Sequence, residues 1–142
     1  LGCGVPVGAF VLGKKVADAS LAPGDHGTTY GGNPFVCAAV SKVFDLYEKE
    51  QIVDHVKKVG GYLEQKLNAL VEKYDFLKER RGKGLIQGLE VEGRPIGEIV
   101  NRGLEEGLII ITAGSNVLRF VPPLVVTEAD VDEMITKLEK CF

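Results

Sequence analysis

The chain has 142 residues, of which 45% are hydrophobic, so it is long enough to bury one sizeable core and is neither disordered nor fibrous in composition. Twenty acidic and seventeen basic residues give a formal net charge of −3, which argues against the basic surface that nucleic-acid binding requires. The three cysteines lack metal-type spacing and predict free thiols in a reducing compartment, and no apolar run approaches a membrane span. We therefore expect a cytoplasmic protein that binds neither nucleic acid nor membranes.

The first 33 residues predict little regular structure. Residues 8–12 indicate a short strand without an evident partner, and residues 14–19 indicate a helical turn. The stretch GDHGTTYGGNP follows at residues 24–34. Its glycines free backbone N–H groups to approach an anion, and Thr28 and Thr29 add hydroxyl donors, so the loop suits a phosphate group. An ordinary surface connection that ends at a helix N-cap explains the same composition.

Two consecutive helices are predicted next. Asn33 as N-cap and Pro34 at the first helical position begin a helix that ends near residue 50. A second amphipathic helix is predicted over residues 51–74. The pair Gly60 and Gly61 weakens this helix locally, and we interpret it as a site of close packing rather than a hinge.

The remaining residues predict a small sheet with two more helices. After a turn at residues 81–84, the predicted elements are a strand over residues 85–91, a helix over residues 95–107, a hairpin over residues 108–121, and a last helix that begins with a capping box of Thr127 and Asp130. This order predicts an α/β domain of two layers, with helices packed on a small, mainly antiparallel sheet. Residues 34–142 would form this domain, and residues 1–33 do not fit it.

Four segments resemble motifs of the class III aminotransferases, which are pyridoxal-phosphate enzymes. They are LGCGVPVGA at residues 1–9, GDHGTTYGGNP at residues 24–34, RGKGLIQGLE at residues 81–90 and LRFVPPL at residues 118–124. The four follow one another with the family's order and spacing, which makes chance implausible. The resemblance implies that residues 1–33 end the large, cofactor-binding domain, and that residues 34–142 form the small C-terminal domain.

The resemblance also implies roles for individual residues. Thr29 would reach the cofactor phosphate in the partner's active site of a homodimer, and Thr28 would lie beside the substrate. Arg119 would bind a substrate carboxylate, because an arginine among apolar strand residues is costly unless its guanidinium meets an anion. An arginine on an edge strand with a solvated head is the alternative. The lysine that binds the cofactor would lie upstream of Leu1, so this chain would supply no catalytic residue or metal ligand and would be inactive alone.

For the complete enzyme, the resemblance implies transfer of an amino group to 2-oxoglutarate, with the cofactor as electron sink. The implied donor is N-acetylornithine, in arginine biosynthesis, and the alternatives are ornithine and 4-aminobutyrate. An alternative of another class is a non-catalytic α/β module that only folds and dimerises. Neither histidine is assigned to catalysis. We expect His26 to be a structural hydrogen-bond donor in the glycine loop and His55 to be solvated on its helix.

Overall fold

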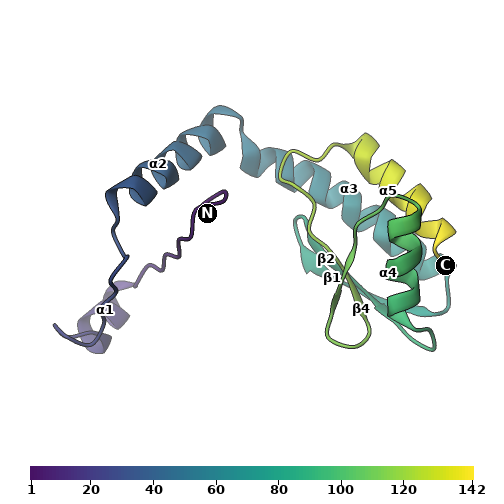
Figure 1. Cartoon of the computed structure of the whole chain (residues 1–142), viewed down its shortest axis with the longest axis horizontal. Helices are drawn as coiled ribbons and strands as arrows, with labels where there is room; N and C mark the ends of the chain where they lie inside the picture. Colours follow the sequence, from purple (N-terminus) through teal and green to yellow (C-terminus); the bar gives the residue numbers. More distant parts are fainter. The chain divides into compact units, whose positions relative to one another are not determined.

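The computed structural model describes all 142 residues, and its contacts divide the chain into two compact units, residues 1–51 and residues 52–142. The elements are α1 (Lys14–Ser20), α2 (Pro34–Lys49), α3 (Ile52–Lys73), β1 (Leu77–Lys83), β2 (Ile86–Val91), α4 (Ile96–Glu105), β3 (Ile111–Ala113), β4 (Val117–Phe120) and α5 (Glu128–Lys140) (Figure 1). The predicted α/β class is confirmed. The units divide after Gln51, so that α2 falls in the first unit, and the assignment of residues 1–33 and 34–142 to two domains stays a prediction. None of the helices combines the length and the apolar composition needed to cross a membrane.

The first unit is held mainly by local hydrogen bonds. The predicted N-cap is confirmed, since Asn33 Oδ1 accepts hydrogen bonds from the backbone N–H groups of Phe35 and Val36. The predicted helical turn forms as α1, which buries no residue, and α2 buries only Val43. The strand expected over residues 8–12 does not form, because an extended segment needs a partner for its backbone hydrogen bonds and none lies beside it.

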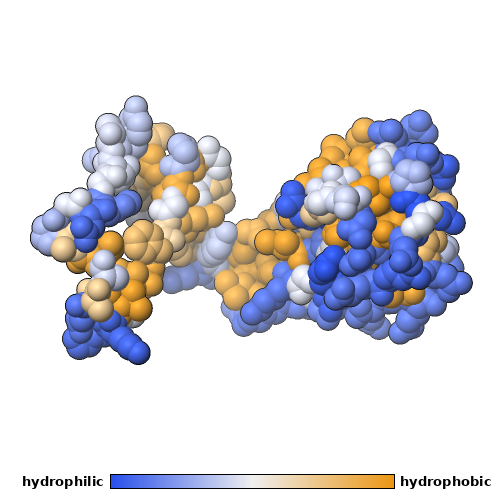
Figure 2. Space-filling view, turned by 90° about the horizontal axis from the view of Figure 1, so that it is seen from below, coloured by the Kyte–Doolittle hydropathy of each residue, from blue (hydrophilic) through white to orange (hydrophobic).

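Large apolar side chains lie on the surface of this first unit, as the apolar colouring of Figure 2 shows. Phe10 is 66% exposed, Val11 96% and Phe35 75%. Several such side chains together are typical of a surface that another domain or subunit covers.

The second unit is built on one antiparallel sheet. Its strand order is β1-β2-β4-β3, and each neighbouring pair is antiparallel, which confirms the predicted sheet. Leu89 and Leu118 face each other across β2 and β4, and both are fully buried against the helices. Each buried leucine contributes about 1.5–3 kcal/mol. The core cluster continues into α3 and α5, and its fully buried members there include Leu63, Leu67 and Leu138.

Strand β1 was missed by the sequence analysis. In its sequence, LKERRGK, Leu77 has the only apolar side chain, and residues 81–83 extend the strand where a turn was predicted. β1 is an edge strand in which only Leu77 is fully buried, and pairing with β2 together with the contacts of Arg80 to α3 holds the other residues. The turn lies one step later, at Gly84, whose φ of 58° is favourable for glycine.

Helix α3 runs through Gly60 and Gly61 without a break. A Cβ atom at Gly60 would lie 2.9 Å from the backbone of Gly84, whereas a Cβ at Gly61 would meet nothing within 4 Å. The predicted close packing is therefore confirmed for Gly60, and it brings α3 against the turn between β1 and β2.

Two polar clusters join α3 to α5. Asp132 on α5 accepts a hydrogen bond from the Tyr62 hydroxyl at 2.8 Å and forms a salt bridge with Lys66 at 2.7 Å. The hydrogen bonds from Lys66 and Tyr62 hold the pKa of Asp132 below its ordinary value of 3.8. A second cluster repeats this arrangement further along both helices, and it comprises Glu139, Lys73 and Tyr74. There, the hydrogen bond from Lys73 lowers the pKa of Glu139 below its ordinary value of 4.5.

These lowered pKa values predict a loss of stability in acid. The unfolded chain binds more protons than the folded one at acidic pH, so the stabilising contribution is complete above the ordinary values of 3.8 and 4.5. It is lost as the pH falls through the lowered pKa values of Asp132 and Glu139. Urea unfolding followed by circular dichroism should show a steeper acid decline for the parent chain than for Asp132→Asn. The control Asp54→Asn, in an exposed pair with Lys57, should keep the parent slope, and equal slopes for all three proteins would contradict the assignment.

The exposure of the first unit predicts where proteases cut first. Chymotrypsin should cleave after Phe10 and Tyr30, which are 66% and 84% exposed, before it cleaves after Phe120, which is 3% exposed. Peptide mapping over time gives the order of cleavage. Protection of residues 1–33 equal to that of α5 would show that the first unit is as firmly held as the second.

Candidate functional site

Strand β4 places Arg119 on the outer face of the sheet, by which we mean the face that points away from the buried core. Leu118 and Phe120 are buried, and the alternation of a strand turns Arg119 to the opposite side, where it is exposed. Strand β4 lies between β2 and β3, so the alternative that places Arg119 on an edge strand is wrong. The salt bridges of the sheet's arginines involve Arg80 and Arg81, whereas Arg119 forms none. Its guanidinium can therefore bind an external anion.

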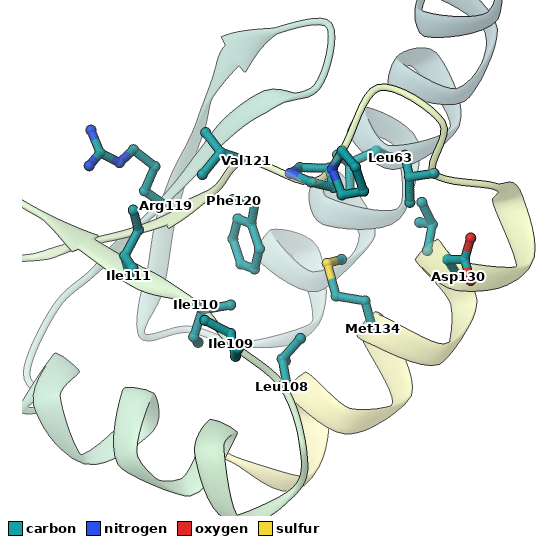
Figure 3. A pocket seen from close by; sticks show the side chains of 14 residues that line it. Leu63, Leu108, Ile109, Ile110, Ile111, Arg119, Phe120, Val121, Asp130 and Met134 are labelled. Atoms are coloured by element: carbon teal, nitrogen blue, oxygen red, sulfur yellow. The ribbon is translucent and has the colours of Figure 1, made fainter. Parts of the chain in front are cut away.

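A pocket of about 400 Å³ lies between β3, the end of β4 and α5. Its lining is mostly apolar and includes Ile109, Phe120 and Met134. Arg119 belongs to the lining, but Figure 3 shows its guanidinium pointing away from the apolar side chains. The one carboxylate of the lining, Asp130, is held by the N–H and hydroxyl groups of Thr127 in the capping box. The pocket thus suits an apolar group, and the polar chemistry lies outside it.

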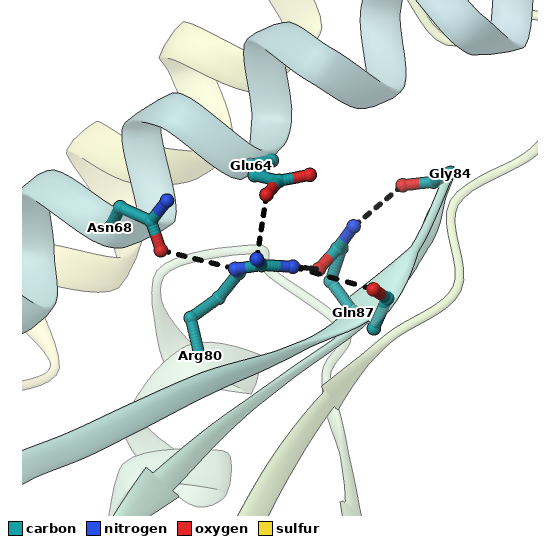
Figure 4. Close-up of polar contacts among 6 residues, drawn as sticks. Glu64, Asn68, Arg80, Gly84 and Gln87 are labelled. Carbon is teal, nitrogen blue, oxygen red and sulfur yellow. Dashed lines mark hydrogen bonds and ion pairs between the residues drawn. The ribbon is translucent and has the colours of Figure 1, made fainter.

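A buried polar network fixes the strand beside β4. Gln87 on β2 is 1% exposed, and its amide donates to Gly84 O at 2.7 Å and accepts from Arg80 at 3.0 Å. Arg80 also bonds Glu64 at 2.6 Å and Asn68 at 3.0 Å, both on α3 (Figure 4). Every buried polar side-chain atom has a partner, so the network ties the β1–β2 hairpin to α3 without an unsatisfied group.

The sequence analysis predicted the strand that carries Gln87 but missed the partner of its side chain. Arg80 lies in a run of polar residues that indicated no strand, so no local sequence pattern showed on which face of the sheet its side chain would lie. A glutamine in phase with buried residues was the one signal that a polar group must meet it in the core.

The glycine loop presents hydroxyl and amide groups at its surface. Thr28 Oγ1 accepts a hydrogen bond from the Gly31 N–H at 3.2 Å and so closes a turn, which leaves its own proton free to donate. Thr29 is exposed and bonds no residue of the chain. Gly24 and Gly32 have φ values of 100° and 69°, which turn the backbone as only glycine readily does. The free hydroxyls and backbone N–H groups are donors that fit a phosphate group.

The predicted site residues fall in different units. Thr28 and Thr29 belong to residues 1–51 and Arg119 to residues 52–142. Within the first unit, Thr28 lines a hollow of about 360 Å³ together with His26 and other residues, whereas Thr29 does not. The roles of the three residues stay predictions.

Both expectations for the histidines were wrong. The His26 ring forms no hydrogen bond and instead makes an edge contact with the Phe10 ring at a centroid distance of 6.3 Å. His55 is half-buried rather than solvated, and its Nε2 lies 2.9 Å from the Val126 carbonyl oxygen, to which it donates. This contact arises because the segment before α5 packs beside the first turns of α3.

Comparison with known proteins gives a whole-chain match. The family model for aminotransferase class-III matches residues 1–142. The acetylornithine aminotransferase of Gloeobacter violaceus is 45% identical over 143 residues, which cover 100% of this chain and 35% of that protein. The acetylornithine aminotransferase of Methanocaldococcus jannaschii is 44% identical over 142 residues, with the same two coverages. This chain therefore spans about a third of the length of these relatives.

Solved structures agree with the sequence comparison. The ornithine aminotransferase of Toxoplasma gondii superposes with a TM-score of 0.76 and 31% identity, over 85% of this chain and 30% of that one. The acetylornithine aminotransferase of Elizabethkingia anophelis gives a TM-score of 0.76 and 30% identity, over 85% of this chain and 31% of that one. The α/β fold described above is thus shared with aminotransferases.

The Arg80–Gln87 network predicts the effect of one substitution. Gln87→Leu removes the acceptor for Arg80 and the donor for Gly84 O. Each of these two groups then lacks a hydrogen-bond partner in a largely buried position. We expect the free energy of unfolding to fall by about 1–3 kcal/mol. Gln65→Leu, the same exchange at an exposed position of α3, is the matched control and should change it by less than about 0.5 kcal/mol. Urea unfolding measures both, and equal effects would contradict the structural role.

Proposed function

This chain belongs to the class-III aminotransferases, and we propose that it is the C-terminal part of an enzyme that transfers an amino group from N-acetylornithine to 2-oxoglutarate. The observation that supports this proposal is the match of the whole chain to acetylornithine aminotransferases at 45% and 44% identity. An ornithine donor is the alternative, and it is supported by structural likeness at 31% identity. In this proposal the enzyme serves arginine biosynthesis in the cytoplasm.

The proposal assigns the glycine loop to the cofactor. Pyridoxal phosphate, when bound, supplies the electron sink for amino-group transfer. Thr29 and the loop's backbone N–H groups would hold its phosphate, because they are free donors at a glycine-rich turn. Thr28 would lie beside the substrate, with its hydroxyl oriented by the Gly31 N–H. Residues 1–33 would then end the large domain, and residues 34–142 would form the small one.

Arg119 would hold the substrate by its carboxylate. The guanidinium presents two parallel N–H donors that match the two oxygens of a carboxylate, which fixes the direction of the bound molecule. Strand β4 supports this geometry well, since it pairs with a strand on each side and its buried residues pack in the core. N-acetylornithine and 2-oxoglutarate both carry an α-carboxylate, so one arginine can serve both halves of the reaction.

A homodimer is part of the proposal. The exposed apolar side chains of residues 1–51, among them Phe10, Val11 and Phe35, support a surface that is covered in the complete protein. The glycine loop would reach the active site of the partner. Without the upstream lysine, we expect the isolated chain to be only a folded, dimerising module.

The activity is tested with the full-length enzyme that contains this chain. Its kcat/KM with 2-oxoglutarate should be highest for N-acetylornithine, lower for ornithine and lowest for 4-aminobutyrate. The isolated chain, assayed with added pyridoxal phosphate, should give no turnover. A preference for ornithine would select the alternative, and turnover by the isolated chain would contradict the assignment of the lysine to the upstream part.

Arg119→Lys in the full-length enzyme should weaken substrate binding. Lysine keeps the charge but loses the planar pair of donors. A charge-assisted contact contributes about 1.5–3 kcal/mol, so the KM for amino acid and oxo acid should rise by roughly one to two orders of magnitude. Steady-state kinetics measure this change, while the cofactor content should stay the same.

Thr29→Val is the companion variant and should show the reverse pattern. It removes the hydroxyl but keeps the shape, so cofactor retention during dialysis should fall while the KM of the loaded enzyme changes little. If Arg119→Lys released the cofactor and left substrate kinetics alone, the role proposed for Arg119 would be wrong.

A further inference from the structure

The pairing between β3 and β4 ends at Ile111 and Arg119. The same register would place Ile109 opposite Val121, but two prolines follow Val121, and a proline has no N–H group with which to continue the ladder. The backbone N–H groups of Ile109 and Ile110 donate no hydrogen bond. Ile110 is nevertheless buried, and buried backbone groups are normally paired. This chain therefore leaves a short apolar segment without a backbone partner.

The apolar pocket of about 400 Å³ lies where these two strands separate. Its floor is made of core side chains such as Phe120, and its rim carries Ile109 and Val121 (Figure 3). These two rim residues are 83% and 53% exposed. The lining has two charged residues, of which Arg119 points away and Asp130 is held in the capping box. The pocket is thus an apolar space beside an unpaired stretch of backbone.

The two edges of the sheet differ in how they are protected. Strand β1 has the sequence LKERRGK, and its charged side chains oppose pairing with a further strand. The segment LIIIT at residues 108–112, in which β3 begins, has no charge, no glycine and no proline. An uncharged, apolar edge is a template for pairing, and native proteins cover such edges. The composition of the two edges therefore indicates that β1 faces solvent and that residues 108–112 are covered.

We propose that residues 108–111 and the adjoining pocket bind an extended apolar segment from the upstream part of the same protein. The segment pairs its backbone with Ile109 and Ile110, and it places an apolar side chain in the pocket. This inference rests on the proposed function only in so far as that function makes the chain the C-terminal part of a longer enzyme. It concerns an interaction surface and involves neither the cofactor nor the substrate.

The length of the relatives supports an occupant from the same protein. The match covers 35% of the acetylornithine aminotransferases of Gloeobacter violaceus and Methanocaldococcus jannaschii, so about two thirds of each lies outside it. A segment of the same chain covers the site at every protein concentration, whereas a second copy covers it only after association. The homodimer surface proposed above belongs to residues 1–51, whereas the pocket belongs to residues 52–142.

Photo-crosslinking from position 109 of the full-length holoenzyme tests the proposal. Ile109 is replaced by the photoreactive residue p-benzoylphenylalanine, and the irradiated protein is separated under denaturing conditions and mapped by mass spectrometry. The expected product has the mass of one chain and joins position 109 to a peptide upstream of residue 1. A product with the mass of two chains would show a second copy at the site. That result, a link within residues 1–142, a small-molecule adduct or no adduct would each overturn the inference.

The variant Ile109→Lys of the full-length enzyme gives an independent measurement. Ile109 is 83% exposed in this chain, so a lysine is tolerated there if the site stays open to solvent. Under an apolar segment the same lysine buries a charge, and the thermal midpoint should fall by at least about 3 °C. Val53→Lys, at a 56% exposed position of α3, is the matched control and should change the midpoint by less than about 1 °C. No fall for Ile109→Lys, or an equal fall for both variants, would contradict the proposal.

The substrate assay separates a failure of this inference from a failure of the proposed function. A full-length enzyme that turns over N-acetylornithine but shows no link from position 109 to the upstream part would remove only the inference. An enzyme that prefers ornithine but shows the link would remove the assigned amino donor and leave the inference standing.

Discussion

The antiparallel pairing of β2 with β4 is the constraint on which the second unit depends. Its register sets Leu89 opposite Leu118 in the core and Gly88 opposite Arg119 on the outer face. Because side chains alternate along a strand, a slip of one residue would bury Arg119 and expose the leucines. The Gln87 amide and its hydrogen bonds oppose such a slip. They fasten β2 to α3 through Arg80, so the polar network and the apolar core enforce the same register.

The first unit follows a different principle. Its helices begin at local signals such as Asn33, but α1 and α2 together bury only Val43, and large apolar side chains stay exposed. Local hydrogen bonds therefore shape the glycine loop, while burial contributes little to holding it. A loop with free hydroxyl and N–H donors is suited to gain order from an anion that binds them.

The proposed chemistry is divided between the packed sheet of the second unit and the locally hydrogen-bonded loop of the first. Substrate recognition is assigned to Arg119, which a rigid, paired strand presents, and cofactor binding is assigned to a loop that local turns shape. Rigidity matters most for the arginine, because a bidentate contact tolerates little change in direction. Strand pairing sets Arg119 between Gly88 on β2 and Ile111 on β3.

The sequence by itself determined the helices, the capping box of Thr127 and Asp130, strand β2 and the family, because caps, periodicity and motifs are local properties of the chain. Only the tertiary structure decided that the polar segment LKERRGK is a strand, that residues 8–12 are not, and that His55 meets Val126. It alone set Gly88 beside Arg119, which lies 31 residues further along the chain. These features depend on which distant segments pair and in which register, and register follows from the packing of the whole core rather than from any local pattern.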